Sequence, residues 1–313
     1  MRGLRTALFR MALVAAALFA AYAIAWPNTY YLLFVINLTY FASLVLAWNL
    51  VGGYAGQLDL AAAAYMALGG IVASVLTDSW RLNPLLSMLL GGAAAALLAA
   101  AVGAPAFRFG VKEVWYALMS ATLVVILNNA ARLIMGPYEY YLSVRPIASY
   151  DQLFLATLLL LVATLLVNYA IAASRAGYYL RAIREDELAA EMIGVDTWKY
   201  KMFALVVYAF IVGFSGYLYV ALVGYFYTYR FFDSSVALSI ALLGIIGGLG
   251  SVEGCLASAF VLRGLGEYLR ASLGSTIPGL HLLLYGAVLI AVGIFEPEGF
   301  AGIARRIWKV IRT

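Results

Sequence analysis

The sequence predicts an all-α, polytopic membrane protein built from about ten transmembrane helices. Hydrophobic residues make up 65% of the 313 residues and the mean hydropathy is +0.96, whereas soluble domains are about 45–50% apolar. Only 11% of the residues are charged. Unbroken apolar runs such as residues 85–104 match the roughly 20 residues that a helix needs to cross a bilayer core. They do not show the alternating pattern of a transmembrane β-barrel.

Apolar runs separated by turn residues predict the spans in order, within a single transmembrane domain over residues 1–313. We expect helices at 8–25, 30–50, 58–77, 85–102, 113–135, 153–173, 202–225, 232–248, 254–272 and 280–296. The first run resembles a signal peptide, because Ala23-Ile24-Ala25 is typical of a cleavage site. We favour an uncleaved helix, since the next span begins almost at once near Tyr30. The 232–248 run is the weakest prediction, because it is short and rich in glycine at its end.

Basic residues predict that both termini face the cytoplasm, because Lys and Arg are enriched in cytoplasmic loops. They gather before the first span, between the fourth and fifth spans, in the segment 174–201, and after the last span. Outside that segment, these residues are Arg2, Arg5, Arg10, Arg108, Lys112, Arg305, Arg306, Lys309 and Arg312. An even number of spans places all four groups on one side. The net charge of +5 therefore reflects membrane orientation, and we expect no nucleic-acid partner.

The segment 174–201 is a predicted cytoplasmic loop that concentrates the chain's scarce charge. Ten charged residues of both signs lie between Arg175 and Lys201. A short helix is expected over 186–194, with Asp186 capping its start and Gly194 ending it in the left-handed conformation. Helical spacing groups the apolar side chains of Leu188, Ala189, Met192 and Ile193 on one face and Glu187 with Glu191 on the other. Such a helix fits a partner with an apolar groove and a basic rim, or a solvated position on the membrane surface.

The same loop carries a resemblance to a known family. The stretch "LRAIREDELAAEMIGVDTWKYKMFAL" resembles the cytoplasmic coupling loop of ABC-importer permeases, which has Glu-Ala-Ala, three residues and Gly. Ala189, Ala190 and Gly194 keep that spacing, while Leu188 stands where Glu is usual. The permeases for branched-chain amino acids share this departure. "NLVGGYAGQLDLAAAAYMALGG" (49–70) and "GIIGGLGSVEGCLASAF" (244–260) are similar to two further segments of that branch, in the right order. Asp59 and the alanines after it depart from the more usual Ser-Leu-Gly-His.

The resemblance implies a division of labour among subunits in a prokaryotic plasma (inner) membrane. A homologous second permease subunit would complete the path, two cytoplasmic ATPase subunits would dock on the loop, and an extracytoplasmic solute-binding protein would deliver the solute. The predicted ATPase-coupling residues are Arg184, Glu185, Asp186, Glu187, Leu188, Ala189, Ala190, Glu191, Met192, Ile193 and Gly194. The sequence lacks the G-x-x-x-x-G-K-[ST] phosphate loop, so we expect it not to hydrolyse ATP alone and to be no enzyme.

Candidates for the substrate path are polar or glycine residues within the apolar spans. Residues 49–70 and 244–266 share a glycine pair, a polar break and a small-residue helix, which is typical either of transporter repeats or of close helix packing. Backbone N–H groups at such a break suit an anionic head group, and polar groups in a span are costly unless they serve a function or bind a neighbouring helix. The candidates are Gly52, Gly53, Gly56, Gln57, Asp59, Asn128, Asn129 and Arg132.

Other function classes fit less well. A single cysteine, Cys255, excludes an intramolecular disulfide, and we expect no metal site, cofactor or catalytic residue. An intramembrane serine protease is suggested only by Gly213-Phe214-Ser215-Gly216 and a lone histidine, His281. An ion-coupled secondary transporter would need a titratable group at mid-membrane, and no isolated carboxylate lies at the centre of a predicted span. The resemblance therefore implies a permease for leucine, isoleucine or valine, with urea or a short amide as the alternative solute.

Overall fold

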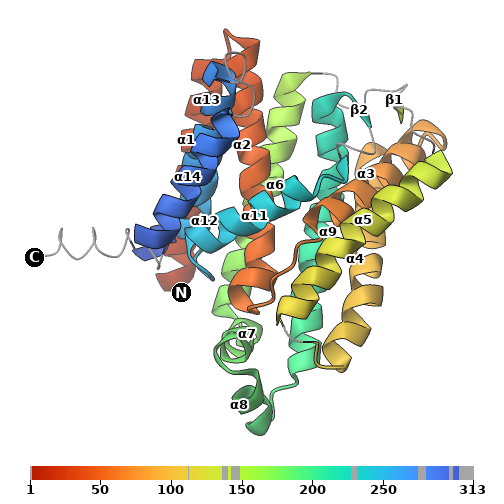
Figure 1. Cartoon of the computed structure of the whole chain (residues 1–313). Coiled ribbons are helices and arrows are strands. Elements are labelled where there is room, and N and C mark those ends of the chain that lie inside the picture. Colours follow the sequence, from red (N-terminus) through yellow and green to blue (C-terminus); the bar gives the residue numbers. More distant parts are fainter. Residues whose placement is uncertain are drawn as a thin grey trace, which may run out of the picture.

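The computed structural model describes residues 2–111, 113–135, 140–141, 149–226, 231–273, 280–295 and 299–302. It confirms the all-α class. Within these ranges two strands of two residues each, β1 (Tyr140–Tyr141) and β2 (Tyr225–Phe226), pair antiparallel, with Tyr140 opposite Phe226. Everything else of regular structure is helical, and the helices form one elongated bundle (Figure 1).

The first half of the chain forms helices that run to and fro along the bundle (Figure 1). In order they are α1 (Arg2–Ala25), α2 (Thr29–Trp48), the π-helical turn η1 (Asn49–Tyr54), α3 (Ala62–Asp78), α4 (Pro84–Arg108) and α5 (Glu113–Met135). Local signals set their starts. The side chains of Asn28 and Asn83 accept hydrogen bonds from the backbone N–H groups of Tyr30 and Leu85, as N-caps do. Between η1 and α3, residues 56–61 form a non-helical connection.

The second half contains the protruding loop and a group of shorter helices. In order they are α6 (Tyr150–Ala173), α7 (Arg175–Glu185), α8 (Glu187–Met192), α9 (Thr197–Val223), α11 (Ser234–Gly247), α12 (Val252–Ser258), the π-helical η2 (Ala259–Arg263), α13 (Gly264–Leu273) and α14 (Leu280–Phe295). α12, η2 and α13 follow one another without a break. α11 runs obliquely to α2 and α6 in Figure 1.

The ten apolar segments expected from the sequence all fall on helices. The third begins at Ala62 rather than at 58, because 56–61 are not helical. Among the described residues, five helices are long and apolar enough to cross a membrane: Thr29–Tyr54, Pro84–Arg108, Val114–Ile134, Tyr150–Ala173 and Thr197–Val223. Arg10–Ala25, α3 and α11 are shorter apolar helices. The count of ten crossings stays a prediction.

Small residues allow α3, α4 and α9 to pack at close range. A Cβ atom added to Gly69 would overlap the carbonyl group of Gly213, and one added to Gly216 would overlap the carbonyl oxygen of Met66. Without a hydrophobic driving force between helices in lipid, such close approach supplies van der Waals contact that holds membrane helices together. The glycines of the apolar runs therefore position the helices that surround residues 56–61.

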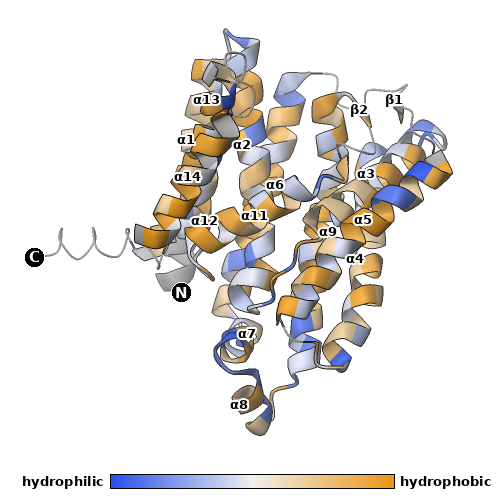
Figure 2. Ribbon diagram, in the orientation of Figure 1, coloured by the Kyte–Doolittle hydropathy of each residue, from blue (hydrophilic) through white to orange (hydrophobic). Residues whose placement is uncertain are grey.

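Large apolar side chains cover the outside of the bundle. Examples on α4, α5 and α6 are Leu89, Leu97, Leu118, Ile126, Leu133 and Leu159, all of them exposed. Figure 2 shows hydrophobic residues over the length of these helices and hydrophilic residues around α7 and α8. In water this surface would drive aggregation, whereas in a bilayer it faces acyl chains. The fold is that of a polytopic membrane protein.

The two ends of the bundle differ. α7 and α8 protrude at one end, and β1, β2 and α13 lie at the other (Figure 1). The assignment of the α7–α8 end to the cytoplasm is a prediction from the basic residues. Of those residues, Lys112, Arg305, Arg306, Lys309 and Arg312 lie outside the described residues.

Candidate functional site

The protruding loop contains a short helix with well-defined ends. The Asp186 side chain accepts a hydrogen bond of 3.0 Å from the backbone N–H of Ala189, which confirms it as the N-cap of α8. Gly194, just beyond the helix, has φ +88°, the left-handed conformation that glycine adopts without strain. Both ends of the predicted helix therefore form as expected.

The tip of the loop is an exposed apolar surface. Leu188, Met192 and Ile193 are 75%, 88% and 78% exposed, and Ala189 beside them is exposed as well. Ala190 faces the other way and packs with Ile183 and Val195 in a small core of the loop itself. Large exposed apolar side chains at the end of a protruding helix are typical of a docking surface.

The acidic side of α8 is exposed but has partners within the protein. Glu187 forms an ion pair of 2.6 Å with Lys201 Nζ, and Glu191 accepts a hydrogen bond of 2.6 Å from Thr197 Oγ1. The Lys201 side chain is only 3% exposed and its ammonium lies 5.0 Å from the ring centre of Phe107 on α4. The two glutamates thus fasten α8 to the first turns of α9. From the sequence, we expect these glutamates to face a basic rim on a partner protein. In the structure they contact Lys201 and Thr197 of the same chain.

Arg184 connects the loop to two distant segments of the bundle. Its Nη1 donates hydrogen bonds to the carbonyl oxygens of Gly53, at 2.8 Å, and Leu249, at 3.2 Å. Its Nη2 pairs with Glu185 at 2.8 Å. Gly53 lies in η1, and Leu249 lies in the turn between α11 and α12, so one guanidinium holds the loop against both.

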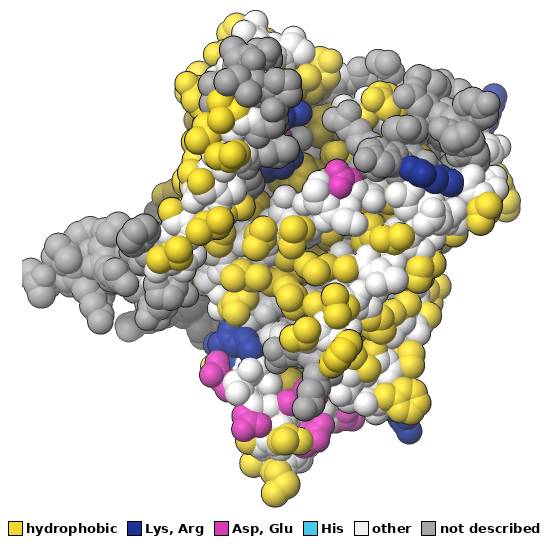
Figure 3. Space-filling model, viewed as in Figure 1, with side chains coloured by type: hydrophobic (Ala, Val, Ile, Leu, Met, Phe, Trp, Pro, Cys, Tyr) yellow, Lys and Arg dark blue, Asp and Glu magenta, His cyan; other side chains and the backbone are white. Residues whose placement is uncertain are grey.

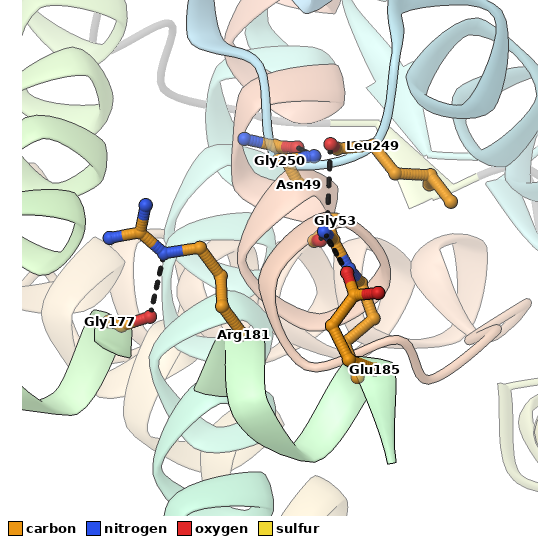
Figure 4. Close-up of polar contacts among 8 residues, drawn as sticks. Asn49, Gly53, Gly177, Arg181, Glu185, Leu249 and Gly250 are labelled. Carbon is orange, nitrogen blue, oxygen red and sulfur yellow. Dashed lines mark hydrogen bonds and ion pairs between the residues drawn. The ribbon is translucent and has the colours of Figure 1, made fainter. Parts of the chain in front are cut away.

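A second set of hydrogen bonds ties the same two segments to each other. The backbone N–H of Gly250, which has φ +77°, donates to Asn49 Oδ1 at 3.0 Å. Asn49 Nδ2 donates to Asn168 Oδ1 at 3.1 Å, and Asn168 donates to the carbonyl of Leu46 at 2.9 Å. The two glycine-rich stretches that resemble each other in sequence therefore meet beneath the loop. Figure 4 shows Asn49, Gly53, Leu249 and Gly250 at this junction.

The first group of predicted substrate-path residues surrounds this junction. Gly52 and Gly53 are buried in η1, and Gly56 has φ +70° with the Arg184 side chain beside its Cα. Gln57 is 3% exposed, and its Oε1 accepts no hydrogen bond from the described residues. Their contact with a solute stays a prediction, and the contacts present in this structure are with the loop and with one another.

Asp59 lies in a cage of tyrosine hydroxyl groups. Its Oδ2 accepts hydrogen bonds from Tyr116 at 2.9 Å and Tyr65 at 3.4 Å, and its Oδ1 accepts from Tyr208 at 3.4 Å. Oδ1 also accepts from the backbone N–H of Ala61 at 2.8 Å. The carboxyl group is fully buried. Because the three tyrosines come from α3, α5 and α9, Asp59 joins the non-helical connection to three helices.

The second group of candidates lies elsewhere on α5. Asn129 and Arg132 are exposed, and Asn129 donates to the carbonyl of Val125 at 2.9 Å. The Oδ1 atom of Asn128 is buried and has no hydrogen-bond donor among the described residues. At 1.5 Å per residue, Asn128 lies about 18 Å further along α5 than Tyr116. The structure therefore does not bring this group together with Asp59.

Several residues that shape the site were missed from the sequence. Asn49, Asn168, Lys201 and the tyrosines around Asp59 carry the contacts just described. A signal was present for Asn168, which interrupts the apolar run of α6, because a polar side chain within a span is costly unless it is paired. Nothing local marks the tyrosines, since tyrosine is common in these apolar helices.

Comparisons with known proteins agree with this arrangement. Residues 28–293 match the family model described as "Branched-chain amino acid transport system / permease component". The chain is also 28% identical over 155 residues to the high-affinity branched-chain amino acid transport system permease protein LivM of Escherichia coli strain K12 and of Salmonella typhimurium. That match covers 49% of this chain and 35% of each relative, so the chain aligns with about a third of their length. No solved structure matches the chain. Since the family model covers most of the sequence, the chain belongs to the branched-chain amino acid permease family and is a multi-pass protein of the inner membrane.

Proposed function

We propose that this chain is a transmembrane permease subunit of a binding-protein-dependent ABC importer for leucine, isoleucine or valine. Its family membership supports a transport role, and the exposed apolar tip at Leu188, Met192 and Ile193 supports docking of a cytoplasmic ATPase. The partners are a second permease subunit, two ATPase subunits and an external solute-binding protein. The permease performs no chemistry on the solute.

The observation that carries the proposal is the position of Arg184. A force applied to the apolar tip of α8 reaches α9 through the Glu187–Lys201 ion pair and reaches η1 and the α11–α12 turn through Arg184. Gly53 lies at the end of η1 and Leu249 in the turn after α11, so both contacts of Arg184 are at places where a helix ends. Packed elements respond to such a force by switching between discrete arrangements rather than by bending smoothly. We therefore propose that ATP-driven movement of α8 opens and closes the path at the junction of residues 49–56 and 248–251.

The test is uptake of labelled leucine into proteoliposomes that contain the whole complex. We expect uptake to require the ATPase subunits, ATP and the cognate binding protein, and to be inhibited by isoleucine and valine. Omission of one component at a time provides the controls. Competition by urea without competition by isoleucine would show that the solute is a short amide, while the permease assignment would survive.

An ion-coupled secondary transporter is the second candidate, and Asp59 is the observation that favours it. A carboxyl group buried among helices is a typical site of ion coupling in membrane transporters. Such a transporter would accumulate leucine in vesicles that contain this chain alone and an ion gradient. Uptake that persists without ATPase subunits and stops when the gradient is dissipated would establish this alternative.

A further inference from the structure

A cavity of about 360 Å³ lies between α2, α9 and α13, at the end of the bundle opposite α8. Its volume is in the range of small-molecule sites, which is roughly 300–1,000 Å³. Figure 3 shows a hollow beside α13 with Lys or Arg and Asp or Glu side chains on its wall. None of the residues proposed so far for coupling or for the substrate path lines this cavity.

One part of the cavity wall is charged. Glu267 forms ion pairs with Arg263 at 3.0 Å and with Arg270, whose Nε lies 2.9 Å from the carboxylate. Two guanidinium groups on one carboxylate leave a net positive charge beside the cavity. Arg270 uses Nε and Nη2 for Glu267, and among the described residues nothing accepts a hydrogen bond from its Nη1. This arrangement orients a guanidinium that still has donors for an anion, as in bidentate carboxylate recognition.

A second part of the wall offers an acceptor. Asn37 lines the cavity from α2, and its Oδ1 is buried without a hydrogen-bond donor among the described residues. Buried polar atoms are nearly always satisfied, so an orphaned acceptor on the wall of a cavity suggests that a ligand supplies the missing donor. The aromatic rings of Tyr30 and Phe34 line the same region, and ring faces attract a cation.

The remaining wall is apolar. Leu33, Leu222 and Val223 come from α2 and α9 and face the cavity together with Phe34. The cavity thus combines a cation that can bind a carboxylate, Arg270, with an acceptor for an ammonium group, Asn37 Oδ1, and an apolar surface. A zwitterion with a small aliphatic side chain matches all three at once, whereas a neutral amide leaves the guanidinium without an anionic partner.

We propose that this cavity is an outer, low-affinity binding site for a free α-amino acid with an aliphatic side chain. The carboxylate binds Arg270, the ammonium binds Asn37 Oδ1, and the side chain packs on Phe34 and Leu222. This inference rests on the proposed function, because it takes the solute to be an amino acid. Glu267 positions Arg270 and does not itself need to touch the solute.

The helices that line the cavity also reach the loop at the other end of the bundle. α2 continues into η1, where Gly53 accepts a hydrogen bond from Arg184. α9 begins at Thr197, and its residues Thr197 and Lys201 hold α8. The loop and the outer site are therefore connected through two continuous helices.

The test measures protection of a cysteine in the cavity wall. Cys255, the chain's single cysteine, is buried and is replaced by serine, and Leu222→Cys is introduced in the full complex. We measure its rate of modification by a charged methanethiosulfonate with leucine, 4-methylpentanoate, isopentylamine or urea present; the second and third compounds are leucine without its ammonium and leucine without its carboxylate. Leucine should slow modification at millimolar concentration. The amine alone or the carboxylate alone should need about ten times that concentration, and urea should have no effect. This readout needs neither ATP nor uptake.

Side-chain variants in the same background assign the two polar contacts. Arg270→Gln should raise the leucine concentration for half-protection about tenfold or more, as expected for loss of a hydrogen bond to a charged group, and should abolish protection by 4-methylpentanoate. Asn37→Leu should weaken protection by isopentylamine and leave protection by 4-methylpentanoate unchanged. Arg81→Gln is the matched control, because Arg81 is exposed in the turn between α3 and α4 at the same end.

Two results would overturn this site. The first is leucine uptake by the complex without any protection of Leu222→Cys, which leaves the proposed function intact. The second is protection by urea but not by leucine. Absence of leucine uptake in the wild-type complex would instead refute the proposed function. If the complex with Arg270→Gln fails to assemble, the modification rates of Leu222→Cys with the four added compounds still decide between these outcomes.

Discussion

Arg184 Nη1 lies 2.8 Å from the carbonyl oxygen of Gly53, a residue 131 positions earlier in the chain. The same nitrogen lies 3.2 Å from the carbonyl oxygen of Leu249. One side chain of the loop thus satisfies carbonyl groups at two breaks in the helical bundle, where no helical N–H is available to them. Movement of the loop and rearrangement of these breaks are therefore coupled through a single guanidinium.

Replacing this guanidinium tests the coupling. We expect Arg184→Gln to leave the complex assembled and able to hydrolyse ATP. Leucine uptake per ATP should fall roughly 5- to 150-fold, the factor that corresponds to typical coupling free energies between two sites. Arg181→Gln is the matched control on the same helix, because within the described residues the Arg181 guanidinium donates hydrogen bonds to the nearby carbonyl groups of Gly177 and Ala172 and not to Gly53 or Leu249. Equal uptake per ATP in the Arg184→Gln and wild-type complexes would contradict the mechanism.

The second prediction concerns the end of α8. Gly194→Val should uncouple ATP hydrolysis from uptake, because a β-branched residue resists the left-handed φ of +88°. A Cβ atom at this position would meet nothing within 4 Å, so the effect isolates backbone conformation from steric overlap. Gly194→Asn is the control, since asparagine tolerates this conformation. Stimulated ATPase activity and uptake are measured together, and full coupling in the valine variant would rule out the requirement.

The third prediction concerns the stability conferred by the tyrosine cage of Asp59. Tyr116→Phe removes the 2.9 Å hydrogen bond to Oδ2 and should destabilise the protein by about 1–3 kcal/mol, the usual effect of depriving a buried acceptor of a donor. Tyr65→Phe should cost less, because its bond to the same oxygen is 3.4 Å long. Thermal unfolding of the purified protein in detergent gives both values. A larger loss of stability in Tyr65→Phe than in Tyr116→Phe would show that the shorter hydrogen bond is not the stronger one here.

The fourth prediction concerns orientation in the membrane. In a Cys255→Ser background, Ile193→Cys should react with an impermeant reagent only from the cytoplasmic side, and Trp80→Cys only from outside. Both positions are well exposed, at 78% and 72%, so accessibility reflects the side of the membrane rather than burial. Labelling of Arg312→Cys from outside would mean an odd number of spans, with 232–248 or 254–272 failing to cross.

The sequence by itself determined the class of the protein and its local elements. Composition alone requires lipid as the solvent, and the ten apolar runs locate the helices because each run depends only on its own residues. The ends of α8 were predictable for the same reason. The bond from Ala189 to Asp186 spans three residues, and the left-handed Gly194 is a property of one residue.

Only the tertiary structure decided which residues act together. Glu187 and Glu191 are turned toward Lys201 and Thr197 by the way the loop folds back on α9. Arg184 reaches carbonyl groups 131 and 65 residues away, and the Asp59 cage draws one tyrosine from each of three helices. Such contacts depend on how close-packed helices approach and how far side chains extend, and neither quantity is a property of any short stretch of sequence.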